Sequence, residues 1–340
     1  MRRARRGMTL IEVTISVGIL VVVVAMTMSV VIEGVRSSRR GQQLADANDA
    51  ARFAGEALVH AVQAAGFGMA NGLYVSHGGV VVRTSPLVVI NSTTGPDELW
   101  VVRTHRAALL EACVDDGAAT TVQASGFGKM LVRCAVRDGA GGAPTLLLAT
   151  NMSSGALLSN PTFNASGAGQ ELDYTEAGVA NFGPDPNRGF QKGDLVMPAL
   201  VERYFIGVDN GAPALMVQPG TVGSVAQGFA PTGGPRVLQR FVEDLQLAVG
   251  LDATVSGEPD NVTFSSASVG PAWTARLRSV RVSVVARSPQ TVLDAAGSQQ
   301  AADLRPMTVE DHAPGLPVDG FRRTLFSRRV ELSNVGAVDL

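Results

Sequence analysis

The stretch MRRARRGMTLIEVTISVGILVVVVAMTMSVVIEG, residues 1–34, decides how the chain is organised. Val13–Ile32 is a run of 20 residues without a charge. A helix of that length rises about 30 Å, which is enough to cross the hydrocarbon core of a membrane. The run is preceded by Arg2, Arg3, Arg5 and Arg6. Basic flanks tend to stay on the cytoplasmic side, so we expect the rest of the chain to be exported.

Glu12 is the residue that a plain signal anchor leaves unexplained. A carboxylate at the mouth of an apolar helix is costly and usually has a partner or a function. No basic residue between Met8 and Ile32 can supply that partner. If the chain were cut after Gly7, the new amine of Met8 would lie four residues away on the same helix face. The amine of a neighbouring subunit would serve equally well.

The stretch RRGMTLIEVTISVGILVVVVA, residues 5–25, resembles the prepilin signal of type IV pilins and of type II secretion pseudopilins. The resemblance implies that a prepilin peptidase cuts after Gly7 and methylates the new N-terminus at Met8. It also implies that Glu12, the fifth mature residue, pairs with the Met8 amine of an adjacent subunit as the filament forms. Met8 departs from the family, in which Phe is commonest at this position.

A stalk is expected to continue the same helix beyond the apolar run. Small and apolar residues recur at spacings of three and four, which predicts a helix with one buried face. These residues are Leu44, Ala47, Ala51, Ala54, Leu58, Ala61, Val62 and Ala65. Gly66, Phe67 and Gly68 are predicted to end the helix. From Met8 to Ala65 it would be about 87 Å long.

The stalk and four later segments resemble the PilW-type minor pilins. These segments are ANDAARFAGEALVHAVQAAGFGMANG (47–72), VERYFIGVDNGAPALMV (201–217), RFVEDLQLAVGLD (240–252), LRSVRVSVVARS (277–288) and FRRTLFSRRVELSN (321–334). In PilW-like chains such segments occur in the same order and span nearly the whole sequence. Major pilins tend to carry a helix-bending proline in the anchor. No proline lies between Met8 and Ile32, which favours a minor subunit.

The head is predicted to be rich in strands. Short apolar or alternating runs are separated by Gly, Pro, Asn and Ser turns, and no helical pattern lies between them. In the segment 245–251 alternation predicts an inward face of Leu245, Leu247, Val249 and Leu251 and an outward face of Gln246, Ala248 and Gly250. In the segment 280–284 it predicts one shared face of Val280, Val282 and Val284. The fold class is therefore α+β, with a long N-terminal helix followed by a mainly antiparallel head.

The resulting organisation has four parts. Residues 1–7 form a cleaved leader, 8–32 the transmembrane or filament-core helix, 33–66 a periplasmic stalk, and 67–340 the head, with one lobe or two. The formal charge is -2 and becomes more negative once the leader arginines are removed. That balance gives no electrostatic footprint for nucleic acid.

No enzymatic motif or cofactor site emerges from the sequence. Walker, GxSxG, HExxH and CxxC patterns are absent, and the four histidines, His60, His77, His105 and His312, are not spaced as a ligand pair. His60 is expected to be a partly exposed helix residue. His312 has Glu310 and Asp311 beside it, but a solvated acidic loop is favoured over a metal site, because adjacent loop side chains need a distant third ligand.

Cys113 and Cys134 are predicted to form a structural disulfide, with two free buried thiols as the alternative. In an exported head such a bridge would close a loop of about 20 residues, worth roughly 3 kcal/mol.

The resemblance implies a protein that works by assembly. It would join other minor pilins in an inner-membrane priming complex, initiate the pilus, and end at the tip beside the major pilin. Its partners would include the prepilin peptidase and the inner-membrane assembly platform, and its head would lie in the periplasm before reaching the cell surface. Two alternatives stay open: a large pseudopilin of a type II secretion system, and a membrane-anchored periplasmic enzyme or binding protein. The residues identify no tip ligand.

Overall fold

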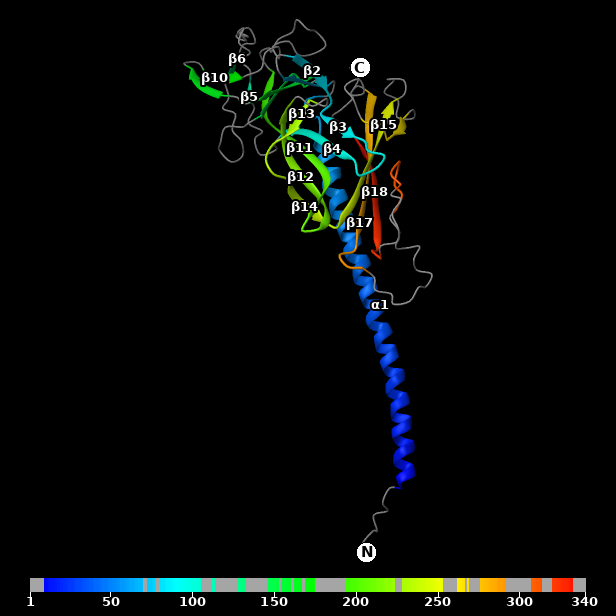
Figure 1. Ribbon diagram of the computed structural model, residues 1–340. Coiled ribbons are helices and arrows are strands. Elements are labelled where there is room, and N and C mark those ends of the chain that lie inside the picture. The colour runs from blue at the N-terminus through cyan, green and yellow to red at the C-terminus, as the bar shows by residue number, and fades with distance from the viewer. Residues whose placement is uncertain are drawn as a thin grey trace.

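The structure is a computed structural model of the whole chain. It describes residues 9–69, 72–77, 80–104, 112–113, 128–132, 146–152, 154–159, 162–166, 169–174, 194–223, 228–252, 262–266, 268, 276–291, 307–313 and 320–332. A single long helix, α1 (Leu10–Ala64), projects from a β-rich head, with the Leu10 end of the helix far from it (Figure 1). The predicted α+β class is confirmed.

Helix α1 runs without a break for 55 residues, about 82 Å. Thr9 caps its N-terminus, and the backbone becomes extended at Ala65 (φ -66°, ψ 144°). Gly66 and Gly68 follow with φ of 77° and 76°, a left-handed conformation that glycine adopts without strain. The predicted end of the helix at this glycine pair is confirmed.

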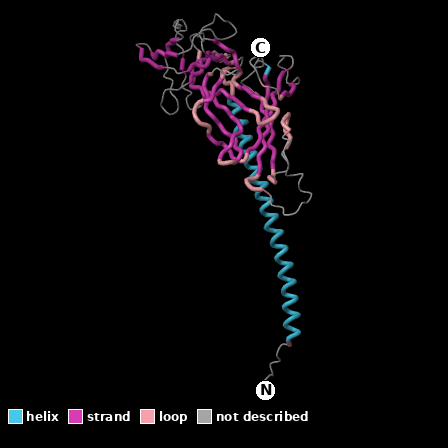
Figure 2. Tube along the Cα trace, viewed as in Figure 1, coloured by secondary structure: helices cyan, strands magenta, loops and turns pink. Residues whose placement is uncertain are grey.

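The head is built mainly of strands (Figure 2). Their bounds are β1 (Leu73–His77), β2 (Val80–Thr84), β3 (Leu87–Ile90), β4 (Glu98–Thr104), β5 (Ala112–Cys113), β6 (Gly128–Val132), β7 (Leu146–Thr150), β8 (Gly155–Ser159), β9 (Thr162–Ser166), β10 (Gly169–Tyr174), β11 (Leu195–Asp209), β12 (Ala212–Val222), β13 (Phe229–Pro231), β14 (Arg236–Arg240), β15 (Val242–Asp252), β16 (Val262–Ser265), β17 (Leu277–Arg287) and β18 (Arg323–Glu331).

Within the described residues the strands form three sheets. The large sheet runs β13-β12-β11-β7-β8-β1-β2, with β14 beside β12, β4 and β5 beside β11, and β3 beside β4. A second sheet has the order β6-β10-β9, and a third, the C-terminal sheet, has the order β16-β15-β17-β18. Strand pairs are antiparallel except β1 with β8, where Leu73 lies opposite Gly155 in a parallel register. The predicted mainly antiparallel head is confirmed.

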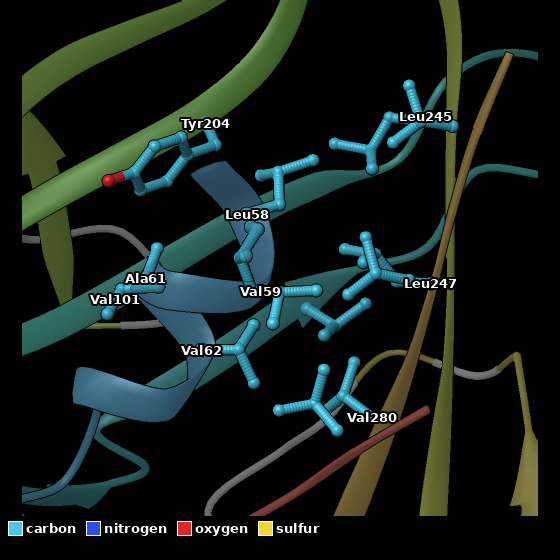
Figure 3. Close-up of a cluster of buried hydrophobic side chains, with 14 of the residues drawn as sticks. Leu58, Val59, Ala61, Val62, Val101, Tyr204, Leu245, Leu247 and Val280 are labelled. Carbon is cyan, nitrogen blue, oxygen red and sulfur yellow. The ribbon is translucent and has the colours of Figure 1, made fainter. Parts of the chain in front are cut away.

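The C-terminal third of α1 lies inside the head rather than below it. From Ala47 onward the helix packs between the C-terminal sheet and one face of the large sheet. Leu58 and Val62 lie close to Leu247 and Val280, with Tyr204 on the opposite side (Figure 3). Of the residues predicted to be buried along this stretch, Leu44 alone is 48% exposed, because it precedes the point where the helix enters the head.

The C-terminal sheet bears out the predicted inward faces and corrects the outward one. The four predicted inward residues of β15 and the three valines of β17 are at most 5% exposed. Gln246, Ala248 and Gly250, predicted outward, are also buried, the first two at 0% and 1% exposure. The loop before β4 lies against Gln246, and residues 307–313 contact the neighbouring strand on this face, so β15 is covered on both sides.

The large sheet is also buried on both faces where β3 and β4 lie. Leu99 and Val101 face the helix, whereas Trp100 and Val102 alternate to the other side, where they join a second hydrophobic cluster. Trp100 stacks on Phe229 in that cluster, with ring centroids 6.0 Å apart. The two clusters thus share a common sheet.

At Gly55 the backbone of α1 lies directly against Phe326 of the C-terminal sheet. A Cβ added there would lie 2.1 Å from Cδ1 of Phe326 on β18. The ring therefore occupies the space that any other residue at this position would need. Gly41, by contrast, has no atom within 4 Å of the position of an added Cβ.

We predict opposite effects for Gly55→Ala and Gly41→Ala. Alanine favours the helix by about 0.5–1 kcal/mol at either site, but at position 55 overpacking against Phe326 costs about 1–3 kcal/mol. Chemical denaturation of the full chain in detergent should show a lower free energy of unfolding for Gly55→Ala and no decrease for Gly41→Ala. Equal behaviour of the two variants would contradict this packing.

Candidate assembly surface

The first half of α1 is apolar on every face and uncovered by the rest of the chain. Each large apolar side chain from Leu10 to Ile32 is between 44% and 87% exposed. Within the part of the chain that the structure describes, α1 is the one helix long and apolar enough to cross a membrane. A helix that is hydrophobic all round is stable only when lipid or other helices cover it.

Three hydroxyl groups in this segment are satisfied by the helix itself. Thr14 donates from Oγ1 to the carbonyl of Leu10 at 2.9 Å. Thr27 donates to Val23 O at 3.0 Å, and Ser29 donates to Met26 O at 2.7 Å. Such back-bonding removes the need for water, so these hydroxyls fit an apolar environment.

Glu12 closes the first turn of α1 by a capping box with Thr9. Glu12 Oε2 accepts from the backbone N–H of Thr9 at 2.9 Å and lies 3.1 Å from Thr9 Oγ1, and Thr9 Oγ1 lies 3.4 Å from the Glu12 backbone nitrogen. Two of the N–H groups that lack helical partners are satisfied in this way. The carboxylate therefore has a local partner within its own chain.

Thr9 was not singled out by the sequence analysis, although the signal was there. The pattern Thr9-Leu-Ile-Glu12 before an apolar run is the capping-box signature. Gly7, Met8 and the leader arginines lie outside the described residues. The predicted cleavage after Gly7 and the predicted pairing of Glu12 with the Met8 amine of a neighbour stay predictions.

The histidine and cysteine predictions have mixed outcomes. His60 is exposed on α1, as expected for a surface helix residue. The side chain of His77 and the whole of His105 lie outside the described part of the chain. Cys134 lies outside it too, as does the side chain of Cys113, so the disulfide stays a prediction.

The loop that contains His312 is not the solvated acidic loop that was predicted. His312 is 8% exposed, and its Nδ1 lies 2.8 Å from Asp244 Oδ2. Glu310 accepts from Arg281 Nε at 2.7 Å, and Asp311 accepts from Asn91 at 3.0 Å. The three neighbouring side chains thus bind three different partners, which fasten the loop to the C-terminal sheet and to Asn91 after β3. Among the described residues no group of three or more His, Cys, Asp or Glu could hold a metal ion.

Asp97 joins the large sheet to the C-terminal sheet. Its backbone N–H donates to Leu245 O at 2.8 Å, and its carboxylate accepts from the N–H groups of Ser92 at 2.8 Å and Leu247 at 2.7 Å. Burial raises the pKa of this carboxyl to about 7, while the two backbone donors oppose the rise and the nearby Asp311 and Asp244 add to it. No motif in the sequence indicates this long-range contact.

Residues 203–334 match the family model PilW, described as type IV pilus-assembly protein W. The predicted resemblance to PilW-type proteins is confirmed over that segment, which contains all four strands of the C-terminal sheet. No curated protein matches the sequence. Among solved structures the chain is similar to a type IV-like pilin from Thermus thermophilus, at 13% identity, covering 84% of this chain and 95% of that one. The TM-score is 0.36, too low to carry an inference about function.

We predict that Thr9→Ala loosens the first turn of α1. The Glu12 and Val13 amides, which donate to Thr9 O, should exchange with solvent several-fold faster once the cap is lost. Hydrogen exchange followed by NMR in detergent micelles measures this directly. Thr27→Ala, which removes a hydroxyl from the helix interior, should leave the first turn unchanged, and equal protection in both variants would count against the cap.

We further predict that the stability of the head falls as pH rises through about 7. The folded state holds the Asp97 proton more tightly than the unfolded state, whose pKa is near 3.8, so this contribution is greatest below about pH 4. Unfolding measured across this pH range should show the slope in the natural chain and a smaller one in Asp97→Asn. Asp49→Asn changes an exposed residue of α1 and should keep the pH dependence of the unfolding free energy. If that variant also lost the slope, the slope could not be assigned to Asp97.

Proposed function

We propose that the chain is a minor pilin of a type IV pilus, which joins the inner-membrane priming complex and is placed at the pilus tip. The observation that carries this proposal is the single unbroken helix. Its segment up to Ile32 is apolar on all faces with one carboxylate at its start, and its segment from Ala47 onward forms part of the head core. The PilW match over residues 203–334 supports the same role from the opposite end of the chain.

The first step is processing at the membrane. A prepilin peptidase removes residues 1–7 and methylates the Met8 amine, on the residues that carry the prepilin resemblance. The new cation then stands four residues before Glu12, within reach of this carboxylate or that of a neighbour. The capping box with Thr9 holds Glu12 at the end of the helix until such a partner arrives.

The second step is transfer from lipid into a bundle of parallel helices. Both environments are apolar, so the transfer of the large side chains from Leu10 to Ile32 costs little free energy. The transfer of a charged group is costly, because an ion in an apolar core needs a counter-ion. Glu12 and a Met8 amine would supply the pair, which selects the correct axial register of one subunit on the next.

The shape of the subunit supports the proposed placement at the tip. The head is much broader than the helix that enters it (Figure 1). A filament made wholly of such heads would be crowded, whereas a single copy at the end has solvent above it. Other minor pilins, the major pilin and the assembly platform are the partners that this position requires.

We predict that Glu12→Ala leaves cleavage intact and lowers incorporation into sheared filaments by about tenfold or more, because a subunit without the carboxylate cannot complete the ion pair. Immunoblots of sheared pili and of membranes measure both steps, since cleavage shortens the chain.

The matched control is Thr9→Ala, which breaks the same capping box but keeps the carboxylate. Near-normal incorporation of Thr9→Ala beside failure of Glu12→Ala would assign the effect to charge. Equal defects in both variants would mean that Glu12 acts only as a helix cap. Normal incorporation of Glu12→Ala would contradict the proposed ion pair between Glu12 and a Met8 amine.

A further inference from the structure

A hollow of about 520 Å³ lies beside α1 at the point where the helix enters the head. Strands β14 and β17 flank the helix there (Figure 1). Phe53 of α1, Phe241 between β14 and β15, and Pro289 after β17 line the apolar part of the hollow. Asp46 and Asp49 of α1 line the part nearer the anchor. We call this site the stalk hollow and define it by these five residues.

The apolar part of the stalk hollow faces water in the isolated subunit. Phe53 is 56% exposed, although it lies in the segment of α1 that the two sheets enclose. With Val13–Ile32 in the hydrocarbon, Phe53 lies about 32 Å beyond Ile32 along the helix. The headgroup layer is only about 5–8 Å thick, so lipid does not reach this ring. Exposed aromatic side chains are typical of contacts between proteins.

Phe241 is held in a strained conformation that presents its ring to the hollow. Its φ is 64°, a left-handed value that is unusual for an aromatic residue. Its N–H donates to Pro213 O of the large sheet at 2.7 Å, and its carbonyl accepts from the N–H of Arg287 in the C-terminal sheet at 2.8 Å. Hydrogen bonds to both sheets therefore fix this wall of the hollow. Strained positions that are fixed in this way cluster at functional sites.

The side of α1 that carries Phe53 continues into the exposed apolar segment of the helix. Residues at alternating spacings of three and four form a seam along which a neighbouring helix packs. The members of this seam below Phe53 are Asp49, Asp46, Gln42, Arg39, Val35 and Ile32. Val35 and Ile32 are 48% and 44% exposed. A helix that packs on the apolar segment is therefore directed toward the stalk hollow.

The charges on the seam indicate which kind of chain fits. Asp46 and Asp49 are exposed and make this part of the hollow negative. The cation next to Asp49 is already engaged, because Arg52 Nε lies 2.8 Å from Glu56 Oε1. Two identical helices packed level along the seam would bring like charges together, which is unfavourable. A different chain with lysine or arginine at this level is favoured instead.

We propose that the stalk hollow is the docking site for the stalk helix of a second, non-identical pilin. An apolar side chain of that helix packs against Phe53 and Phe241, and a basic side chain lies next to Asp46 and Asp49. The inference rests on the proposed function, because a subunit with a parallel N-terminal helix follows the seam upward from the membrane. Polar residues on such a seam specify partner and register. The contact thereby selects which subunit stands beside this one in the priming complex.

The test replaces Phe53 by the photo-reactive analogue p-benzoylphenylalanine in the full chain, in cells that assemble pili. Illumination of the membranes followed by mass spectrometry identifies the peptide joined to position 53. We expect a peptide just beyond the apolar run of another chain with a prepilin signal, with lysine or arginine within one helical turn. The matched control places the analogue at Leu325, which is 42% exposed on the face of β18 away from α1, and should not give this cross-link.

Charge reversal tests the acidic part of the hollow. Asp46→Lys with Asp49→Lys should lower the yield of the cross-link by about tenfold or more, because like charges then meet in the contact. Changing the basic residue of the partner to aspartate should restore the yield, which excludes misfolding as the cause. Glu331→Lys, a reversal at an exposed carboxylate of β18, should leave the yield unchanged.

The contrary results separate this inference from the proposed function. If position 53 gives no cross-link while the chain still enters sheared pili, the docking site is wrong and the proposed function stands. A cross-link to a second copy of this chain, to lipid or to a chain without a prepilin signal would also overturn the proposed partner, as would a yield that charge reversal does not change. If the natural chain never enters sheared pili, the proposed function fails and this inference fails with it.

Discussion

A single unbroken helix has to meet the demands of two different surroundings. Its first half must be apolar on every face, because lipid or a bundle of helices covers it. Its second half must be small and apolar along one broad side, because two sheets close on it from Ala47 onward. No proline or extended turn separates the halves, so a displacement of the anchor is carried into the core of the head. This continuity is the constraint on which the other features depend.

The head in turn depends on the helix for its packing. Residues of α1 form the centre of the cluster between the large and C-terminal sheets, and Gly55 lets Phe326 lie against the helix backbone. Outside this cluster, buried polar contacts fix how the sheets meet. Asp97 bonds the edge of β15, and His312 fastens a loop across its outer face. The two sheets of the head therefore pack around the helix, and buried hydrogen bonds fix the position of each sheet.

Much of this arrangement was predictable because it rests on local patterns. The long helix, its end at Gly66 and Gly68, and the inward faces of β15 and β17 follow from periodicity and turn chemistry. The outward prediction for Gln246 was wrong because alternation cannot show that a distant loop covers the second face of a strand. His312 was misjudged for the same reason, since its partner Asp244 lies 68 residues away. The capping box of Thr9 and Glu12 rests on a local pattern as well, and the sequence carries its signature.

The most direct test of the central claim is to delete the gene and to score sheared surface pili and secreted proteins in the same cultures. An initiating minor pilin predicts that pili are lost while secretion continues, and that the natural chain restores them. Normal pili with blocked secretion would instead place the same helix and head in a type II secretion system, and would contradict the role in pilus assembly.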